Sequence, residues 1–132
     1  NVYALGLRPD GSAWRVGLQH PRQGDQLLGV LPVTDRSIAT SGDYQRFFVA
    51  GDQRWHHLLD PATGYPATGM ASISIVAPTG MEADAASTAA FVLGPQAGMA
   101  LVRALGYEAV MFTDDGQLEL TGGLQSLFEV PR

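Results

Sequence analysis

Cysteine and lysine are both absent from this sequence, and no apolar run approaches the length of a bilayer-spanning segment. Without cysteine the protein has no disulfide, no cysteine nucleophile and no thiolate zinc site. The 13 acidic residues outnumber the 8 basic ones, all of which are arginine, and the formal net charge is −5. Because nucleic acids and anionic membranes attract clustered basic side chains, this charge argues against either as a partner.

The composition otherwise indicates one folded domain. Hydrophobic residues make up 45% of the 132 positions, which suffices to bury a core without disulfides and argues against disorder. The 16 glycines and 8 prolines indicate many tight turns. The chain begins at Asn1 without methionine or leader and enters a β-prone run at once, so we expect it to be a fragment of a longer protein.

The first half of the chain alternates β-prone runs with turn signals. Residues 2–7 and 14–18 flank a Pro-Asp-Gly turn sequence, and we expect them to pair as a hairpin. A second hairpin is expected around the Gly-Asp dipeptide at 51–52. Its arms are residues 47–49 and 54–59, and further strands are expected at 26–33, 37–40 and 72–77.

The last third of the sequence contains helical signals. Thr79 and Glu82 have the spacing of a capping box, and the alanine-rich run that follows predicts a helix over 81–93. The Gly-Pro pair at 94–95 ends that helix and begins a second, which Gly106 stops. Two short strands joined by an Asp-Gly turn follow. The fold class is therefore α+β, a mostly antiparallel sheet with a helical pair.

Three polar residues share one face of the first predicted helix. Asp84, Ser87 and Thr88 lie at positions i, i+3 and i+4 of an otherwise apolar segment. A carboxylate and a hydroxyl one turn apart make half of a site for a hard cation such as Mg²⁺. The alternative is that Asp84 faces water and Thr88 bonds back to its own helix. Spacing alone favours that alternative by about two to one.

A second candidate site lies around a histidine pair. His56 and His57 are adjacent in a predicted strand, so their side chains point to opposite faces and do not chelate one metal together. Asp60, Thr63 and Gly64 follow in a turn that can offer backbone N–H groups to an anion. The alternative is an ordinary Asp-Pro turn beside a structural histidine.

A third candidate is the small polar segment Ser41-Gly42-Asp43, which precedes Arg46 and two phenylalanines. We expect a turn here that holds part of a nucleotide. The alternative is a strand-end turn followed by phenylalanines of the core.

In this order, the segments resemble one family, the FAD:protein FMN transferases, or ApbE family. The resemblance covers nearly the whole chain and is most specific in the HxxDPxTG and ADAxST patterns. The segments that carry it are 14–19 (WRVGLQ), 41–44 (SGDY), 57–64 (HLLDPATG) and 83–89 (ADAASTA).

The resemblance implies a fold and a location. Residues 1–132 would form a single but incomplete ApbE-like, T-fold-related domain, because family members are roughly twice as long. The missing amino-terminal half of the same domain would supply a further magnesium ligand and much of the FAD contact. Many family members are exported and lipid-anchored, so the resemblance implies a periplasmic protein or one anchored to the outer face of the inner membrane.

The resemblance also implies an activity: Mg²⁺-dependent transfer of FMN from FAD to a threonine or serine hydroxyl of an acceptor flavoprotein, with release of AMP. Asp84 and Thr88 would bind the magnesium, and His57 would act as the base near the transferred phosphate. The flavin nucleotide would lie near Ser41, Gly42, Asp43, Asp60, Thr63 and Gly64. Three alternatives stay open: hydrolysis of FAD to FMN and AMP, a flavin-binding module without catalysis, and an inactive fragment.

Overall fold

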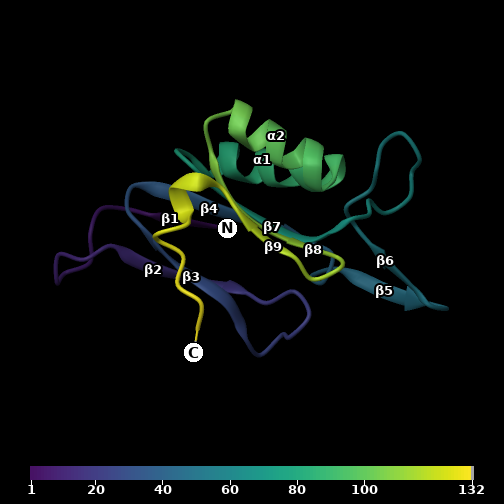
Figure 1. Ribbon diagram of the computed structural model, residues 1–132, viewed down its shortest axis with the longest axis horizontal. Helices are drawn as coiled ribbons and strands as arrows, with labels where there is room; N and C mark the ends of the chain where they lie inside the picture. Colours follow the sequence, from purple (N-terminus) through teal and green to yellow (C-terminus); the bar gives the residue numbers. More distant parts are fainter. Residues whose placement is uncertain (132) are drawn as a thin grey trace.

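The computed structural model describes residues 1–131, and its centre is a five-stranded antiparallel sheet (Figure 1). The strand order is β1-β4-β7-β8-β9. The bounds are Val2–Ala4 for β1, Arg36–Gly42 for β4, Met70–Ala77 for β7, Glu108–Thr113 for β8 and Leu118–Leu120 for β9. Every pairing in this sheet is antiparallel, which confirms the predicted sheet type.

The central sheet lies between two covering layers (Figure 1). Helices α1 (Gly80–Leu93) and α2 (Pro95–Ala104) cover one face, and strands β2 (Trp14–Gln19) and β3 (Leu27–Val33) cover the other. Strand β7 is consequently buried along almost its whole length, including its serines. Serines and isoleucines alternate along β7: the isoleucines belong to the core on the helix side, and the serines lie on the side of the β2–β3 layer rather than in water.

The expected hairpin between residues 2–7 and 14–18 is wrong. Strand β1 pairs with β4, and β2 pairs with β3. The turn between them forms, since the Gly11 N–H donates to the Arg8 carbonyl at 2.9 Å. The two arms meet only where the Trp14 indole donates to the Leu5 carbonyl at 3.1 Å. The turn residues make the chain reverse direction here, but the strands pair according to which apolar faces become buried together.

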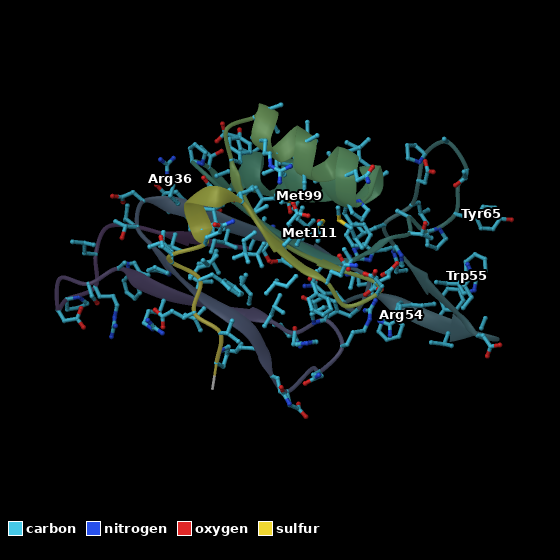
Figure 2. All side chains as sticks on the ribbon, viewed as in Figure 1. Arg36, Arg54, Trp55, Tyr65, Met99 and Met111 are labelled. Carbon is cyan, nitrogen blue, oxygen red and sulfur yellow. The ribbon has the colours of Figure 1, made fainter. Side chains whose placement is uncertain are left out.

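The hairpin around residues 51–52 is confirmed. Strands β5 (Phe47–Ala50) and β6 (Gln53–His56) form a separate two-stranded sheet at one end of the molecule. Its phenylalanines are 44% and 63% exposed, so they are not core residues. Figure 2 shows Trp55 and Tyr65 projecting at this end, with ring centroids 5.8 Å apart.

The predicted capping box at the start of α1 is confirmed. The Thr79 hydroxyl accepts from the Glu82 N–H at 3.3 Å, and the Glu82 carboxylate accepts from the Thr79 N–H at 3.0 Å. The hydrogen bond from the Thr79 hydroxyl holds the pKa of Glu82 below its usual value.

None of the helices within residues 1–131 has the length and apolar content that a membrane crossing requires.

The two helices approach each other through Gly98. A Cβ built there would lie 2.3 Å from the Ala90 carbonyl oxygen of α1 and 2.9 Å from the Met70 side chain. Below this contact, Met99 and Met111 are buried between the helices and the sheet (Figure 2). The helix pair therefore has no space for a larger residue at position 98.

Replacing Gly98 with alanine should lower the free energy of unfolding by about 1–3 kcal/mol, because the added methyl overlaps the backbone of α1. In an open helix the same change would stabilise. Gly122→Ala is the control, since a Cβ at Gly122 meets nothing within 4 Å, and we expect it to change stability by less than about 0.5 kcal/mol. Urea denaturation measures both, and a Gly98→Ala protein as stable as the control would contradict the packing.

Candidate functional site

The polar face of α1 lies against the end of β4. The Ser41 Oγ is 2.9 Å from the Ser87 Oγ and 3.3 Å from the Thr88 Oγ1. Ser41 and Ser87 are buried, whereas Thr88 is exposed. Ser87, and not Thr88, bonds back to its own helix, donating to the Asp84 carbonyl at 2.9 Å. The structure therefore places Thr88, a predicted magnesium ligand, in contact with Ser41, a residue predicted to lie near the flavin.

Asp84 is exposed on the same helix, one turn before Thr88. Its carboxylate accepts a hydrogen bond of 2.7 Å from the side-chain amide of Asn1. The start of the chain thus lies beside α1, although nothing in the local sequence marked Asn1 as a site residue. The carboxylate and the hydroxyl both reach solvent, where a ligand can approach them.

A cavity of about 220 Å³ opens beside Asn1. Parts of two segments that carry the family resemblance line it, residues 16–19 and Tyr44, together with the neighbouring Gln45. Burial raises the pKa of the Tyr44 hydroxyl, so this side chain stays protonated at neutral pH and can donate a hydrogen bond. Neither Ser41 nor Gly42 is part of a turn, because β4 continues through both residues.

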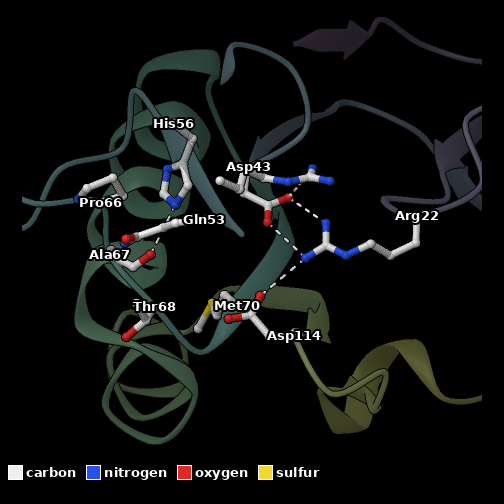
Figure 3. Close-up of a pocket in the computed structure, with 10 residues that line it drawn as sticks. Arg22, Asp43, Gln53, His56, Pro66, Ala67, Thr68, Met70 and Asp114 are labelled. Atoms are coloured by element: carbon white, nitrogen blue, oxygen red, sulfur yellow. Dashed lines mark hydrogen bonds and ion pairs between the residues drawn. The ribbon is translucent and has the colours of Figure 1, made fainter. Parts of the chain in front are cut away.

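Asp43 lies at a second cavity, of about 250 Å³ (Figure 3). The residue is 5% exposed, and its carboxylate forms a two-pronged ion pair with Arg22, at 2.6 and 2.8 Å. Arg54 lies 3.6 Å from the same carboxylate. The hydrogen bonds from Arg22 to the Asp43 carboxylate raise the pKa of the Arg22 guanidinium above its usual value. The flavin-binding role of Asp43 stays a prediction.

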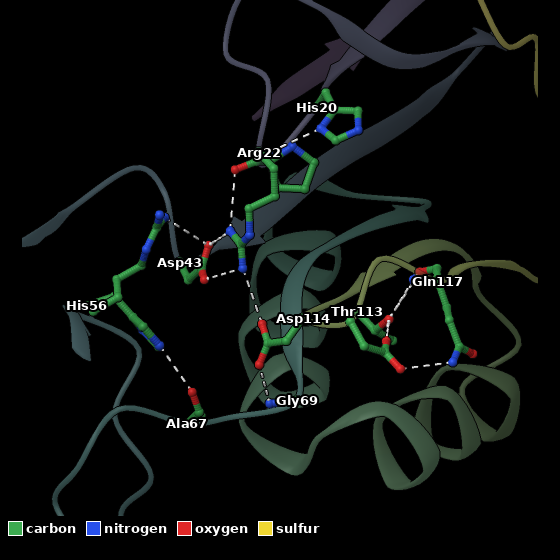
Figure 4. Close-up of polar contacts among 12 residues, drawn as sticks. His20, Arg22, Asp43, His56, Ala67, Gly69, Thr113, Asp114 and Gln117 are labelled. Atoms are coloured by element: carbon green, nitrogen blue, oxygen red, sulfur yellow. Dashed lines mark hydrogen bonds and ion pairs between the residues drawn. The ribbon is translucent and has the colours of Figure 1, made fainter. Parts of the chain in front are cut away.

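The other members of this charged group were not identified from the sequence. Arg22, Arg54 and Asp114 lie far apart along the chain and belong to no shared motif. Figure 4 shows Asp114 joined to Arg22 at 3.3 Å and to the Gly69 N–H at 2.7 Å. Only folding brings the four charges together, so no signal within a sequence window indicates them.

The two neighbouring histidines point to opposite faces, as predicted. His56 is buried; its Nε2 lies 3.1 Å from the Ala67 carbonyl, and its Nδ1 accepts from the Leu58 N–H at 3.3 Å. These partners require the neutral tautomer with hydrogen on Nε2. His57 is exposed, and its Nδ1 lies 3.3 Å from the Arg46 carbonyl. A hydrogen on that Nδ1 leaves Nε2 as a proton acceptor.

The backbone N–H groups of the turn after His57 donate hydrogen bonds to oxygens of the same turn. Thr63 and Gly64 both donate to the Asp60 carbonyl, at 3.2 and 2.7 Å. The Ala62 N–H donates to the Asp60 carboxylate at 2.9 Å, and the Tyr65 N–H donates to the Thr63 hydroxyl at 3.2 Å. The expectation that this turn offers N–H groups to an anion therefore has no support in the structure.

The candidate residues form two groups on the described part of the chain. Ser41, Asp84 and Thr88 lie together on α1 and β4, whereas His57 makes its side-chain hydrogen bond to Arg46 and none to that group within residues 1–131. Across the same residues, no three histidine, aspartate or glutamate side chains are placed to hold a metal.

A family model and curated relatives match this chain. The model of the ApbE family matches residues 1–111. A FAD:protein FMN transferase of Treponema pallidum (strain Nichols) is 38% identical over 94% of this chain and 37% of that protein. The protein of the same name from Escherichia coli (strain K12) is 34% identical over 84% of this chain and 32% of its own length. The chain thus spans about a third of the length of these relatives.

Solved structures of ApbE proteins share the fold. The ApbE protein of Thermotoga maritima matches with a TM-score of 0.84 and 34% identity, covering 92% of this chain and 40% of that one. The flavinyl transferase ApbE of Pseudomonas stutzeri, in its apo form, matches with a TM-score of 0.74 and 32% identity over 96% of this chain and 40% of that one.

Replacing His56 with alanine should lower the free energy of unfolding by about 2 kcal/mol, because the buried Ala67 carbonyl loses its donor and the edge contact with Phe91 disappears. His57→Ala is the matched control: this side chain is exposed, so we expect a change below about 0.5 kcal/mol. Chemical denaturation measures the stability of both variants. Equal losses of stability would contradict the burial of His56 and the exposure of His57.

Proposed function

Since this chain belongs to the ApbE family, we propose that it carries part of the active site of an FAD:protein FMN transferase. The reaction would move FMN from FAD to a threonine or serine hydroxyl of an acceptor flavoprotein and release AMP. The observation that supports this best is the contact between Ser41 and Thr88, 47 positions apart, beside the exposed Asp84 carboxylate. The chain spans 37% of one relative's length, so the activity is proposed for the whole protein that contains it.

Two residues in the middle of α1 fit a magnesium ion. Asp84 and Thr88 offer a carboxylate and a hydroxyl, both exposed and one helical turn apart. Magnesium binds oxygen ligands, takes few carboxylates from protein and completes its shell with water and phosphate, so this small donor set suits it. We propose that these two side chains hold Mg²⁺, which when bound would neutralise negative charge on the FAD diphosphate.

His57 is the proposed general base. Its exposed ring is oriented by the Arg46 carbonyl at Nδ1, which leaves the lone pair of Nε2 available for a proton. The acceptor hydroxyl would lose its proton to Nε2 as its oxygen bonds to the phosphorus of the FMN group, and the bond from that phosphorus to AMP would break. General-base assistance of this kind typically contributes about 10²- to 10⁴-fold in rate.

Replacing Asp84 with alanine in the whole protein should lower Mg²⁺-dependent flavin transfer by more than about 100-fold, because the cation contributes several kcal/mol of charge stabilisation. Mass spectrometry of the acceptor and AMP release measure the reaction. Asp25→Ala is the control, an exposed aspartate in the loop between β2 and β3. Transfer at the normal rate in Asp84→Ala would remove this residue from the site. AMP release without a labelled acceptor in the unmodified protein would favour FAD hydrolysis instead.

Replacing His57 with alanine should lower kcat by about 10²- to 10⁴-fold and leave the dissociation constant for FAD within about twofold, because the proton acceptor is lost but no flavin contact is. Stopped-flow kinetics and a flavin titration separate the two effects. Unchanged turnover would exclude His57 as the base.

A further inference from the structure

We propose that Asp43 is a positioning residue: through Arg54 its carboxylate holds the β5–β6 hairpin, and with it His57, in place against the central sheet. The catalytic part of this inference rests on the proposed function of His57. The structural part does not, since it concerns only how the hairpin is held.

The hairpin is joined to β4 by residues 43–46, but within the described residues neither of its strands pairs with the central sheet. Within residues 1–131, β5 and β6 are hydrogen-bonded only to each other as a sheet. An isolated two-stranded hairpin is marginal in water, so its orientation depends on other contacts. His57 directly follows β6, and its backbone and ring both bond to the Arg46 carbonyl, just before β5. Any movement of the hairpin therefore moves the proposed base.

A polar cavity separates the hairpin from the sheet. The 250 Å³ cavity is lined by Gln53, Arg54 and His56 on the hairpin side and by Asp43 and other polar residues on the opposite side (Figure 3). The Arg54–Asp43 ion pair, at 3.6 Å, crosses this space. His56 adds a hydrogen bond to the Ala67 carbonyl at 3.1 Å and an edge contact with the Phe91 ring of α1.

Asp43 is the rigid end of the link from Arg54. Its N–H donates to the Ala71 carbonyl of β7 at 3.1 Å, which fixes its backbone to the sheet. Arg22 occupies both carboxylate oxygens and is itself paired with Asp114 (Figure 4). With both oxygens engaged and 5% of the residue exposed, the carboxylate has little surface left for any further contact.

The negative charge on Asp43 links Arg54 of the hairpin to Arg22 on the other side of the cavity. Without it, Arg22 and Arg54 would face the cavity as like charges with no anion between them, and their repulsion would push the hairpin away from the sheet. A shift of about 1 Å in a catalytic group can cost about 100-fold in rate, even when substrate binding is intact.

The test compares Asp43→Asn with Glu119→Gln in the whole protein. The asparagine keeps the shape and removes the charge, whereas Glu119→Gln removes an exposed ion pair between Glu119 of β9 and Arg103 of α2. We expect Asp43→Asn to lower kcat by about tenfold or more, with KM for FAD within about twofold, and the control to change neither. A raised KM with unchanged kcat would make Asp43 a flavin contact, and kinetics equal to the control would also overturn the proposal.

Hydrogen exchange tests the same link without any activity. We expect the amides of 47–56 to exchange at least about fivefold faster in Asp43→Asn, while those of β7 keep their rates. Unchanged exchange at 47–56 would overturn the proposal. A wild-type protein that transfers no flavin would refute the proposed function and leave this measurement intact.

A second pair of variants serves if Asp43→Asn does not fold. Arg54 reaches Asp43 through one nitrogen at 3.6 Å, so Arg54→Lys keeps the charge of this contact and Arg54→Met removes it. We expect the lysine variant to retain kcat within about threefold and the methionine variant to lose about tenfold or more. Equal losses in both would contradict a role for the charge.

Discussion

The small side chains on the buried face of α1 determine how near this helix lies to the central sheet. Ala83 and Ala90 are fully buried there, and only residues of this size let the helix backbone pack so close to β4 and β7. The hydroxyl contacts from Ser41 to Ser87 and Thr88 exist because of that short separation. The candidate magnesium pair is therefore placed by apolar packing, and its polar groups lie where the packed layer reaches solvent.

The hairpin that carries His57 is held by a different force. Charged residues make up only 16% of the chain, yet two arginines and two aspartates gather at one cavity between the hairpin and the sheet. Ion pairs across such a space are directional, because both partners must keep one geometry. The two halves of the candidate site thus depend on apolar packing for α1, and on ion pairs together with the buried His56 for the hairpin.

Local signals predicted the elements better than their neighbours in space. The capping box at Thr79 and Glu82 determined where α1 begins, since its hydrogen bonds span three residues. Strand pairing was harder to predict from the sequence. The turn at residues 9–11 forms, but β1 pairs with β4, which lies more than thirty residues away along the chain. The choice between partners depends on which apolar faces become buried together, and no short window contains that information.

By itself, the sequence determined the class of fold, the shared face of Asp84 and Thr88 on one helix, and the opposite directions of His56 and His57, because each follows from the period of a helix or strand. Only the tertiary structure decided which histidine is buried, that Asn1 meets Asp84, and that Asp43 turns toward two arginines. These contacts join residues distant along the chain, and their geometry exists only once the layers have packed.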